Sequence, residues 1–476
     1  MNKKNGNPAD GYDIFVISED VVGEKMAGPG IRAWELTRVL AREFRVVLAV
    51  PAYSPSKKGD PFFENLPFPV IHYDVDDSRL IESTGERSRI ILLPGYVLSK
   101  FPAIKKLKSV LIVDLYVPFV LENMFVHQEK IPNLRDREFI HRNDLQVFHD
   151  LLLSGDHFLC ANDRQKDLFL GSLLSLNRIH PRTLDDNPTL DNLISVVPFG
   201  LSEEKEGPAA EARPESAGFP FPVAADDILF LWGGVISNWF DPLTLIKALA
   251  QAVRKNSRLK LLFLSTVHPN PLLPEFDMAG KAVRLAAELG LQGRHVFFNQ
   301  DWVSYQQRGL FFRRADVGVS IHKINFETYY AFRTRMLDYL KYGLPILCTR
   351  GDFFADLVEK ERIGLTVPAE DIGALEAAIL KLAEDDDFRK MSRARLGLIK
   401  SGFEWEKVAE PLRGYCRRVL AGPPTSTTRL AAKSARALFR PRRSSIFRRL
   451  IHNRHLWPVL QRLPARVSVK LKRLWK

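Results

Sequence analysis

The chain contains two runs in which strand-like and helix-like patterns alternate, with a segment lacking periodicity between them. In the first run the strand candidates are DIFVIS (13–18), FRVVLAV (44–50), PVIHYDV (69–75), RIILLPG (89–95), SVLIVDL (109–115), HFLCA (157–161) and ISVVPFG (194–200). Apolar-periodic helices fall between several of them and are clearest at 31–43 and 136–154. Near-continuous apolar strands that alternate with helices indicate a parallel sheet covered on both faces.

The second run begins after residues 201–227, which are rich in Pro, Ala, Glu and Ser. Its strand candidates are ILFLWGG, KLLFLST, HVFFNQ, ADVGVSI, PILCT and LTV, with helices expected near 242–254, 278–289, 303–313, 328–342 and 370–383. We therefore predict an α/β protein with two Rossmann-like parallel-sheet domains, 1–200 and 228–400, joined by a linker at 201–227. Ligands of such sheets bind at the carboxyl ends of the strands, so the interdomain cleft is the expected site.

Composition and the N-terminal sequence limit the cellular compartments that we expect for the protein. A chain of 476 residues with 46% apolar and 26% charged residues is long enough for two or three globular domains. The N-terminus lacks the apolar stretch of a secretory signal. The most apolar segment, 109–121, is too short to cross a bilayer, and we expect a strand that runs into a loop. The chain has three cysteines, Cys160, Cys348 and Cys416, and no two of them have the spacing of metal ligands. We therefore expect a reduced, cytoplasmic location.

The net charge of +13 is concentrated at the C-terminal end. Residues 421–476 contain 15 Lys or Arg and no Asp or Glu, and the rest of the chain has 54 basic and 56 acidic residues. Large apolar side chains are mixed with these cations, and positions 446, 447, 450 and 451 place one apolar stripe opposite arginines. This basic amphipathic tail favours an anionic membrane surface. A disordered tail and, less favoured, contact with nucleic acid are the alternatives.

Residues 326–352, FETYYAFRTRMLDYLKYGLPILCTRGD, combine an ordinary scaffold with a dense set of charges. The apolar periodicity predicts a helix, which Gly343 and Pro345 end, followed by a buried strand. A structural helix does not need four charged residues beside its apolar face, whereas a binding site for a sugar diphosphate would need them. These four residues are Glu327, Arg333, Arg335 and Asp338.

This segment resembles the donor-sugar region of retaining glycosyltransferases of family 4. Other segments look like motifs of the same family in the same order: GPGIRAWELTRVLA (28–41), GDHFLCANDRQ (155–165), VVPFG (196–200), WGGVISNWFDPLTLIKALA (232–250) and DWVSYQQRGLFFRRADVGVSIH (301–322). The likeness spans about residues 12–400. It implies the GT-B fold, in which residues 385–420 are helical and a helix at 401–420 crosses back onto the N-terminal domain. It also implies a site without a metal or cofactor.

The loop at 19–30 follows the first strand and precedes the first helix. Gly28 and Gly30 allow close backbone approach, and the following helix presents free N–H groups, with Arg32 in its first turn. We interpret these residues as contacts with donor phosphate or acceptor. A βα turn that merely needs glycines is the alternative, and the dinucleotide fingerprint G-x-G-x-x-G is absent.

The two arginines of the 326–352 segment have different expected roles. Two residues apart on a helix, they point about 200° from each other, so they cannot both face one ligand from mid-helix. Arg335 shares a face with Asp338, and we expect donor contacts from both or an ion pair between them. Arg333 then lies in the first turn or just before it, where its planar fork holds a diphosphate; a surface charge is the alternative. Glu327 is the candidate to hold sugar hydroxyls or to stabilise positive charge at the anomeric carbon.

The chain departs from the wider family here. Many members carry two glutamates separated by seven residues. Asp338 occupies the second position, a candidate for ribose hydroxyls, but the first position is Tyr330 when counted strictly. Glu327 takes that role only if three residues are inserted.

A second departure lies after the strand at 228–234. Wider-family members typically place Arg and Lys where this chain has Val235 and Phe240. The diphosphate charge must then be met by Arg333 or Arg335 and by backbone N–H groups. In the same segment we expect donor contacts at Gly233 and Gly234 and acceptor contacts at Trp239 and Asp241; Asp241–Pro242 is also a normal helix start.

Two more polar residues follow strands. Asp114 ends a strand and is expected to bind acceptor hydroxyls or to cap a loop, and His322 is placed to reach the donor or serves a structural role. By resemblance we predict a retaining glycosyltransferase that moves a hexose from a nucleotide diphosphate sugar to a hydroxyl of a lipid-linked or cell-surface polysaccharide acceptor. It would act in the cytoplasm, on the inner face of the cell membrane. The alternatives are a nucleotide-sugar epimerase on the same fold and a non-catalytic sugar-nucleotide-binding protein recruited to the membrane.

Overall fold

The computed structural model describes residues 11–56, 59–201, 219–270, 276–304 and 307–422. The first domain is built on seven parallel strands in the order β3-β2-β1-β4-β5-β6-β7. Their bounds are β1 (Tyr12–Ile17), β2 (Val46–Pro51), β3 (Val70–Tyr73), β4 (Ser88–Pro94), β5 (Val110–Asp114), β6 (His157–Cys160) and β7 (Ile194–Val196). The helices are α1 (Gly28–Ala41), α2 (Arg79–Glu86), α3 (Val97–Lys100), α4 (Phe119–Lys130), α5 (Leu134–Ser154), α6 (Asp163–Ser175) and α7 (Pro181–Asp186).

The second domain contains six parallel strands in the order β10-β9-β8-β11-β12-β13. They are β8 (Ile228–Trp232), β9 (Leu259–Phe263), β10 (Val296–Phe298), β11 (Val317–Ser320), β12 (Ile346–Thr349) and β13 (Gly364–Val367). The helices are α8 (Pro242–Ala252), α9 (Asp277–Glu288), α10 (Gly309–Arg314), α11 (Phe326–Tyr330), α12 (Arg335–Tyr342), α13 (Phe353–Glu361), α14 (Ile372–Glu384) and α15 (Asp386–Ile399). Two parallel-sheet α/β domains were the predicted fold class, which is confirmed.

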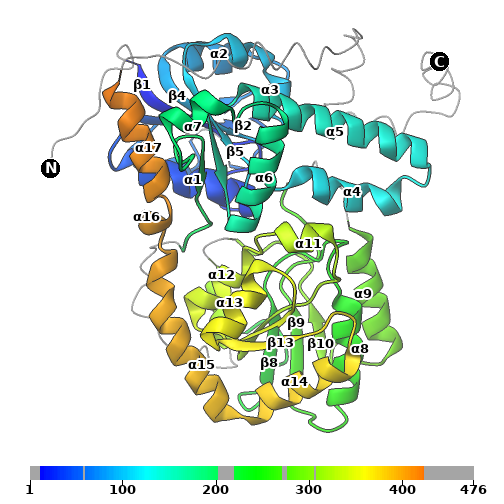
Figure 1. Ribbon diagram of the computed structural model, residues 1–476. Helices are drawn as coiled ribbons and strands as arrows, with labels where there is room; N and C mark the ends of the chain where they lie inside the picture. The colour runs from blue at the N-terminus through cyan, green and yellow to red at the C-terminus, as the bar shows by residue number, and fades with distance from the viewer. Residues whose placement is uncertain (1–10, 57–58, 202–218, 271–275, 305–306, 423–476) are drawn as a thin grey trace, which may run out of the picture.

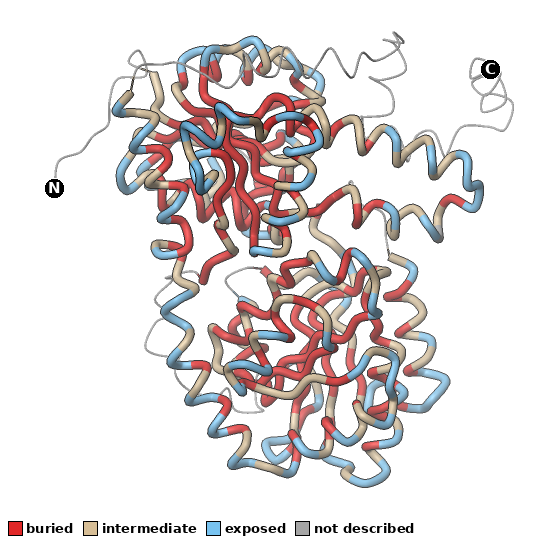
Figure 2. The backbone as a smooth tube through the Cα atoms, in the orientation of Figure 1, coloured by how far each residue is buried: buried red, intermediate tan, exposed pale blue. Residues whose placement is uncertain are grey.

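Burial explains why these sequences form central strands. In β1, Ile14 and Val16 belong to one apolar core, and Phe15 and Ile17 belong to the core on the opposite face of the sheet. All four side chains are almost fully buried. Helices therefore cover both faces, as a near-continuous apolar run requires. Figure 2 shows the buried strands at the centre of each domain, with the exposed residues on the surrounding helices and loops.

The end of the described chain runs along both domains. From α15 it continues through α16 (Trp405–Val408) to α17 (Glu410–Ala421), which lies against the first domain (Figure 1). There the ring of Tyr415 stacks on His157 at a centroid distance of 3.9 Å. Burial in this contact lowers the pKa of His157 to about 4, so the histidine is a neutral part of the core. The basic tail predicted at 421–476 lies, apart from its first two residues, outside the described residues.

The apolar segment at 109–121 contains β5, which runs into a loop at 115–118 as predicted, and α4 begins at Phe119. One local prediction is wrong. We expected one helix at 328–342, but α11 and α12 are separated by residues 331–334, which we call the α11–α12 break. Side chains of the first domain occupy the carbonyls at the end of α11: Arg164 donates to Tyr329 O and Gln165 donates to Tyr330 O. These tertiary contacts override the helical periodicity.

Candidate active site in the interdomain cleft

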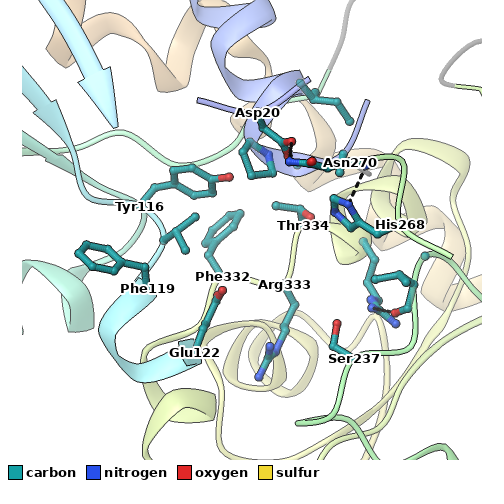
Figure 3. Close-up of a pocket in the computed structure, with 18 of the residues that line it drawn as sticks. Asp20, Tyr116, Phe119, Glu122, Ser237, His268, Asn270, Phe332, Arg333 and Thr334 are labelled. Atoms are coloured by element: carbon teal, nitrogen blue, oxygen red, sulfur yellow. Dashed lines mark hydrogen bonds between the residues drawn. The ribbon is translucent and has the colours of Figure 1, made fainter. Parts of the chain in front are cut away.

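A cleft of about 940 Å³ lies between the two domains. In both sheets the strand order reverses beside the first strand of the domain, between β1 and β4 and between β8 and β11. The loops that follow these strands meet at the cleft, which is the topological position of ligand sites in open α/β sheets. Figure 3 shows side chains from both domains around this space, among them Asp20 and Tyr116 from the first and Ser237, His268 and Arg333 from the second.

Arg32 and Asp114 form a buried pair on the first-domain side. Arg32 Nε and Nη2 donate to the Asp114 carboxylate at 2.6 and 3.0 Å, and Nη1 donates to Pro198 O at 3.1 Å. The guanidinium lies 4.7 Å from the ring centre of Tyr116 and 5.6 Å from that of Phe199. Asp114 lines the cleft and Arg32 does not. The two residues predicted to bind ligands are thus close together, but their polar groups mainly bind each other.

Arg333 and Glu327 form the corresponding pair in the second domain. Arg333 lies in the α11–α12 break, just before α12 as predicted, and lines the cleft. Its Nη1 and Nη2 donate to the Glu327 carboxylate at 3.0 and 2.7 Å. Glu327 has no exposed surface and does not line the cleft. Glu327 therefore orients Arg333, and its carboxylate is not presented to the cleft.

A second carboxylate stands behind this pair. Asp352 Oδ2 lies 3.9 Å from Arg333 Nε and 3.3 Å from His322 Nε2. Its other oxygen, Oδ1, accepts the N–H of Ala355 and caps α13. His322 is fully buried and does not line the cleft, contrary to its predicted contact with a donor. Coulombic attraction to Glu327 and Asp352 outweighs burial and raises the pKa of Arg333, which keeps this cation charged.

Arg335 has a different environment. Its Nη2 donates to Val235 O at 2.9 Å, and its guanidinium lies 4.1 Å from the ring centre of Phe240 and 4.8 Å from that of Trp232. Nη1 is buried and has no hydrogen-bond partner among the described residues. Burial lowers the pKa of Arg335 to about 10, so the residue stays charged at neutral pH. This cation lines the cleft, and none of the carboxylates in the described part of the chain forms an ion pair with it.

The ion pair between Arg335 and Asp338 is not formed. Asp338 instead pairs with Arg308 Nη1 at 3.1 Å, because Arg335 is turned toward the aromatic rings beside Val235. Burial raises the pKa of Asp338 and the cation of Arg308 opposes this shift. Both partners line the cleft, so the Asp338 carboxylate remains a candidate for ribose hydroxyls.

The comparisons with known proteins agree with this geometry. Residues 227–385 match the family model described as glycosyl transferases group 1. The protein carries a group 1 glycosyltransferase domain. It forms the second domain and contains both arginines of the α11–α12 region. Curated proteins gave no match to the chain.

Solved structures extend the comparison to both domains. Sucrose-phosphate synthase from Thermosynechococcus elongatus is 18% identical with a TM-score of 0.59, over 86% of this chain and 99% of that chain. HepE from Anabaena, solved in complex with UDP-glucose, is 13% identical with a TM-score of 0.62, over 86% and 99%. WaaG, a glycosyltransferase involved in lipopolysaccharide biosynthesis, is 14% identical with a TM-score of 0.56, over 86% and 100%. At such identities the likeness establishes the fold, which is that of GT-B glycosyltransferases.

The glycines near the cleft serve different purposes. Gly28 begins α1 and lines the cleft, whereas Gly30 does not line it and a Cβ there would meet Val21 O at 2.0 Å. Gly233 and Gly234 line the cleft, but their N–H groups donate to Tyr339 Oη and Trp232 O. The expected backbone N–H groups for phosphate are therefore occupied at both positions. What the glycines provide is space, since a Cβ at Gly234 would lie 3.7 Å from Arg335 Nη2.

The two predicted acceptor residues of this segment have separate fates. Trp239 lines the cleft and packs edge-on against Phe276, with 5.7 Å between ring centres. Asp241 does not line the cleft; its Oδ1 accepts the N–H of Thr244 at 3.0 Å. It therefore caps α8, which was the alternative prediction for Asp–Pro at this position.

Sequence reasoning missed a contact that crosses the cleft. Asn270 Nδ2 of the second domain donates to Asp20 Oδ1 of the first domain at 2.6 Å, and Asn270 N donates to His268 Nδ1 (Figure 3). Burial raises the pKa of Asp20, while His268 opposes the shift. Asp20 follows β1 as Asp114 ends β5, and that shared position was a usable signal. Nothing near Asn270 in the sequence indicated its role.

Two features are absent from the described residues. No group of three or more His, Cys, Asp or Glu within them is arranged to hold a metal ion. Nor does any helix there have the length and apolar character needed to cross a bilayer.

Proposed function

We propose that the protein is a retaining hexosyltransferase of family 4. It transfers a hexose from a nucleotide diphosphate sugar to a hydroxyl of a lipid-linked or cell-surface polysaccharide acceptor, without a metal or cofactor. The observation that carries the proposal is Arg335, a buried cation that lines the cleft of a group 1 glycosyltransferase domain and has no carboxylate partner among the described residues. An anionic ligand would satisfy its unpaired Nη1 and offset the cost of its burial.

The donor diphosphate fits beside Arg335. Gly234 leaves room next to the guanidinium, and Asp338 lies on the same side of the cleft for the ribose hydroxyls. The N-terminus of α1 opens onto the cleft at Gly28, and its N-cap residue makes no side-chain hydrogen bond. A helix N-terminus adds favourable potential for phosphate. This arrangement replaces the Arg and Lys that wider-family members carry where this chain has Val235 and Phe240.

The reaction follows from that arrangement. The bond between the anomeric carbon and the diphosphate oxygen breaks, and negative charge grows on the diphosphate, where Arg335 and the α1 N-terminus stabilise it. The acceptor oxygen bonds to the same face of the anomeric carbon and passes its proton to the departing phosphate. Arg333, held by Glu327, lies on the wall of the cleft at the reacting sugar. No covalent enzyme intermediate is needed.

Nucleotide binding tests the donor site. We would titrate the protein with UDP, GDP, ADP and their sugars and follow its thermal stability. A ligand at about 100 times its Kd adds roughly 2.7 kcal/mol to stability. We expect one nucleotide family to stabilise the wild type but not Arg335→Met. Arg350→Met is the matched control, because Arg350 pairs with Glu359 on the surface, away from the cleft.

A product assay separates the rival functions. A transferase consumes the donor when acceptor is present and yields a glycosylated product, whereas an epimerase converts the nucleotide sugar with no acceptor. Absence of stabilisation by every nucleotide would contradict the proposal and favour the non-catalytic alternative.

The basic sequence at 421–476 supports a peripheral location on the anionic inner face of the membrane. Deleting residues 423–476 should move the protein from the membrane fraction to the soluble fraction and leave nucleotide binding intact. Unchanged fractionation would contradict the membrane role.

A further inference from the structure

A buried amide joins the two walls of the cleft. Gln165 lies in the first turn of α6 and has no exposed surface. Its Nε2 donates to Tyr116 O of the first domain and to Tyr330 O of the second, each at 2.9 Å. Its Oε1 accepts the N–H of Ala161 at 2.8 Å. Both amide hydrogens are used, one on each domain, so the side chain is satisfied only while the domains are in contact.

The carbonyl on the second-domain side begins the α11–α12 break. Tyr330 is the last residue of α11, and Arg333 follows three residues later. In a continuous helix the Tyr330 carbonyl would accept the N–H of residue 334. Here Gln165 Nε2 replaces that N–H as the donor to Tyr330 O, and residue 331 adopts an extended conformation, with φ −64° and ψ 146°. The conformation that places Arg333 on the cleft wall therefore depends on a donor from the other domain.

Arg164, which precedes Gln165, also contacts the end of α11. Arg164 Nη1 donates to Tyr329 O at 3.3 Å and to Gly351 O at 3.0 Å, and its guanidinium lies 4.3 Å from the Tyr329 ring centre. Gly351 immediately precedes Asp352, the second carboxylate beside Arg333. The start of α6 thus contacts both segments whose carboxylates orient Arg333, namely α11 with Glu327 and the turn before α13 with Asp352.

We propose that Gln165 is a positioning residue that makes the placement of Arg333 depend on closure of the two domains. The proposal rests on the proposed function for its catalytic consequence, but its structural part does not. When the domains separate, Tyr330 O loses its donor and the α11–α12 break is free to relax. Arg333 then leaves the position in which Glu327 presents it to the cleft. The donor is activated only when the first-domain side of the cleft, which Tyr116 lines, is in contact with the second domain.

Hydrogen exchange tests the structural part without any substrate. Gln165→Met keeps the side-chain volume but removes the bonds to Tyr116 O and Tyr330 O, together with the acceptor of the Ala161 N–H. We expect amides in residues 327–337 to exchange about tenfold faster than in the wild type. Ser88→Ala is the matched control, since it removes a buried bond to Thr84 O inside the first domain. Equal exchange in the wild type and Gln165→Met would overturn the proposal.

Kinetics test the catalytic part. In Gln165→Met we expect kcat to fall about tenfold while the donor KM stays within about threefold, because the diphosphate contact at Arg335 is retained. Gln165→Glu supplies a signature that a purely structural role lacks. Its carboxylate cannot donate to the two carbonyls, whereas its protonated form restores one bond, so its activity relative to the wild type should rise as the pH falls.

The outcomes separate the two proposals. Faster exchange at 327–337 together with a wild type that transfers no sugar would support the coupling and reject the proposed function. An active wild type whose kcat and exchange are the same in Gln165→Met and Ser88→Ala would reject the coupling and leave the proposed function standing.

Discussion

Two bidentate arginine–carboxylate pairs border the same cleft and are supported in different ways. Arg32 and Asp114 come from α1 and the end of β5, two elements of one domain, and the guanidinium lies between two aromatic rings. Arg333 and Glu327 are six residues apart on either side of a helix end, and the bonds that stop that helix come from the other domain. The first pair is fixed by its own domain, and the second depends on how the domains meet.

This difference indicates that the two ion pairs have different roles although their chemistry is similar. All three hydrogen-bonding nitrogens of Arg32 are used inside the first domain, which suits a residue that fastens the first turn of α1 to the sheet. The Nε atom of Arg333 has no hydrogen-bond partner among the described residues, and Arg333 lines the cleft. A fixed pair is expected to control stability, and a pair on a conformational break is expected to control turnover.

The largest effect should come from Arg32→Ala. It leaves the Asp114 carboxylate buried without its partner, and breaking a buried pair in this way costs about 3–5 kcal/mol. Urea denaturation of the purified protein measures the loss. Arg45→Ala provides the control, because Arg45 and Asp13 form a partly exposed pair for which about 1 kcal/mol or less is expected. Equal losses in both variants would remove the contrast between the two pairs.

Arg333→Ala should act mainly on turnover. Removing a group that stabilises the transition state typically lowers the rate about 10²–10³-fold. Initial rates with saturating donor and acceptor measure this loss, and the thermal midpoint shows whether the domain stays folded. Glu327→Gln keeps the shape and one acceptor but removes the charge that orients Arg333. We expect a smaller loss of rate, and near-normal activity in Arg333→Ala would reject the catalytic role.

The same contrast explains what the sequence predicts. Apolar runs such as 13–18 identify the buried strands because a strand covered on both faces has no polar positions to hide. The cap at Asp241 follows from Asp–Pro chemistry, which is local. Arg333 was placed correctly because a spacing of two cannot put both arginines on one helix face. These inferences need only neighbours in the chain.

The remaining features depend on residues that are distant in sequence. The α11–α12 break is set by Arg164 and Gln165, which lie in the first domain, 165 residues earlier in the chain than the carbonyls that they bind. Arg335 turns from Asp338 because Phe240 and Trp232 offer ring faces and Val235 offers a carbonyl. Periodicity within one segment contains no information about such partners. The functional residues that sequence reasoning mistook therefore include those whose partners are distant in the chain, within one domain or across the two.

Two glycines of α1 sharpen the comparison on the first-domain side. A Cβ at Gly30 would lie 2.0 Å from Val21 O, so Gly30→Ala forces α1 away from the loop and should cost about 1–3 kcal/mol. At Gly28 the nearest atom to a new Cβ is Thr334 Oγ1 at 3.7 Å, an ordinary contact on the cleft side. Gly28→Ala should leave stability nearly unchanged and weaken nucleotide binding instead. Denaturation and nucleotide titration of both variants check this, and a reversal of the two effects would contradict it.

The smallest effect concerns the carboxylate that meets the other domain across the cleft. Burial raises the pKa of Asp20 above its ordinary value, with Glu19 in the same direction and His268 opposing. The folded state therefore prefers the protonated form. The stability from Asp20 is complete below the pKa of the unfolded chain, about 3.9, and is lost as the pH rises through the higher folded value.

Asp20→Asn removes this pH dependence and tests its sign. Asparagine keeps an oxygen for the N–H groups of Val21 and Asn270 but carries no charge at any pH. We expect the thermal midpoint of the variant to exceed that of the wild type by about 2 °C or less at pH 7.5, with the difference shrinking toward pH 4. Midpoints across that range measure it. A difference that does not change with pH would mean that charging Asp20 opposes neither folding nor the contact between the domains.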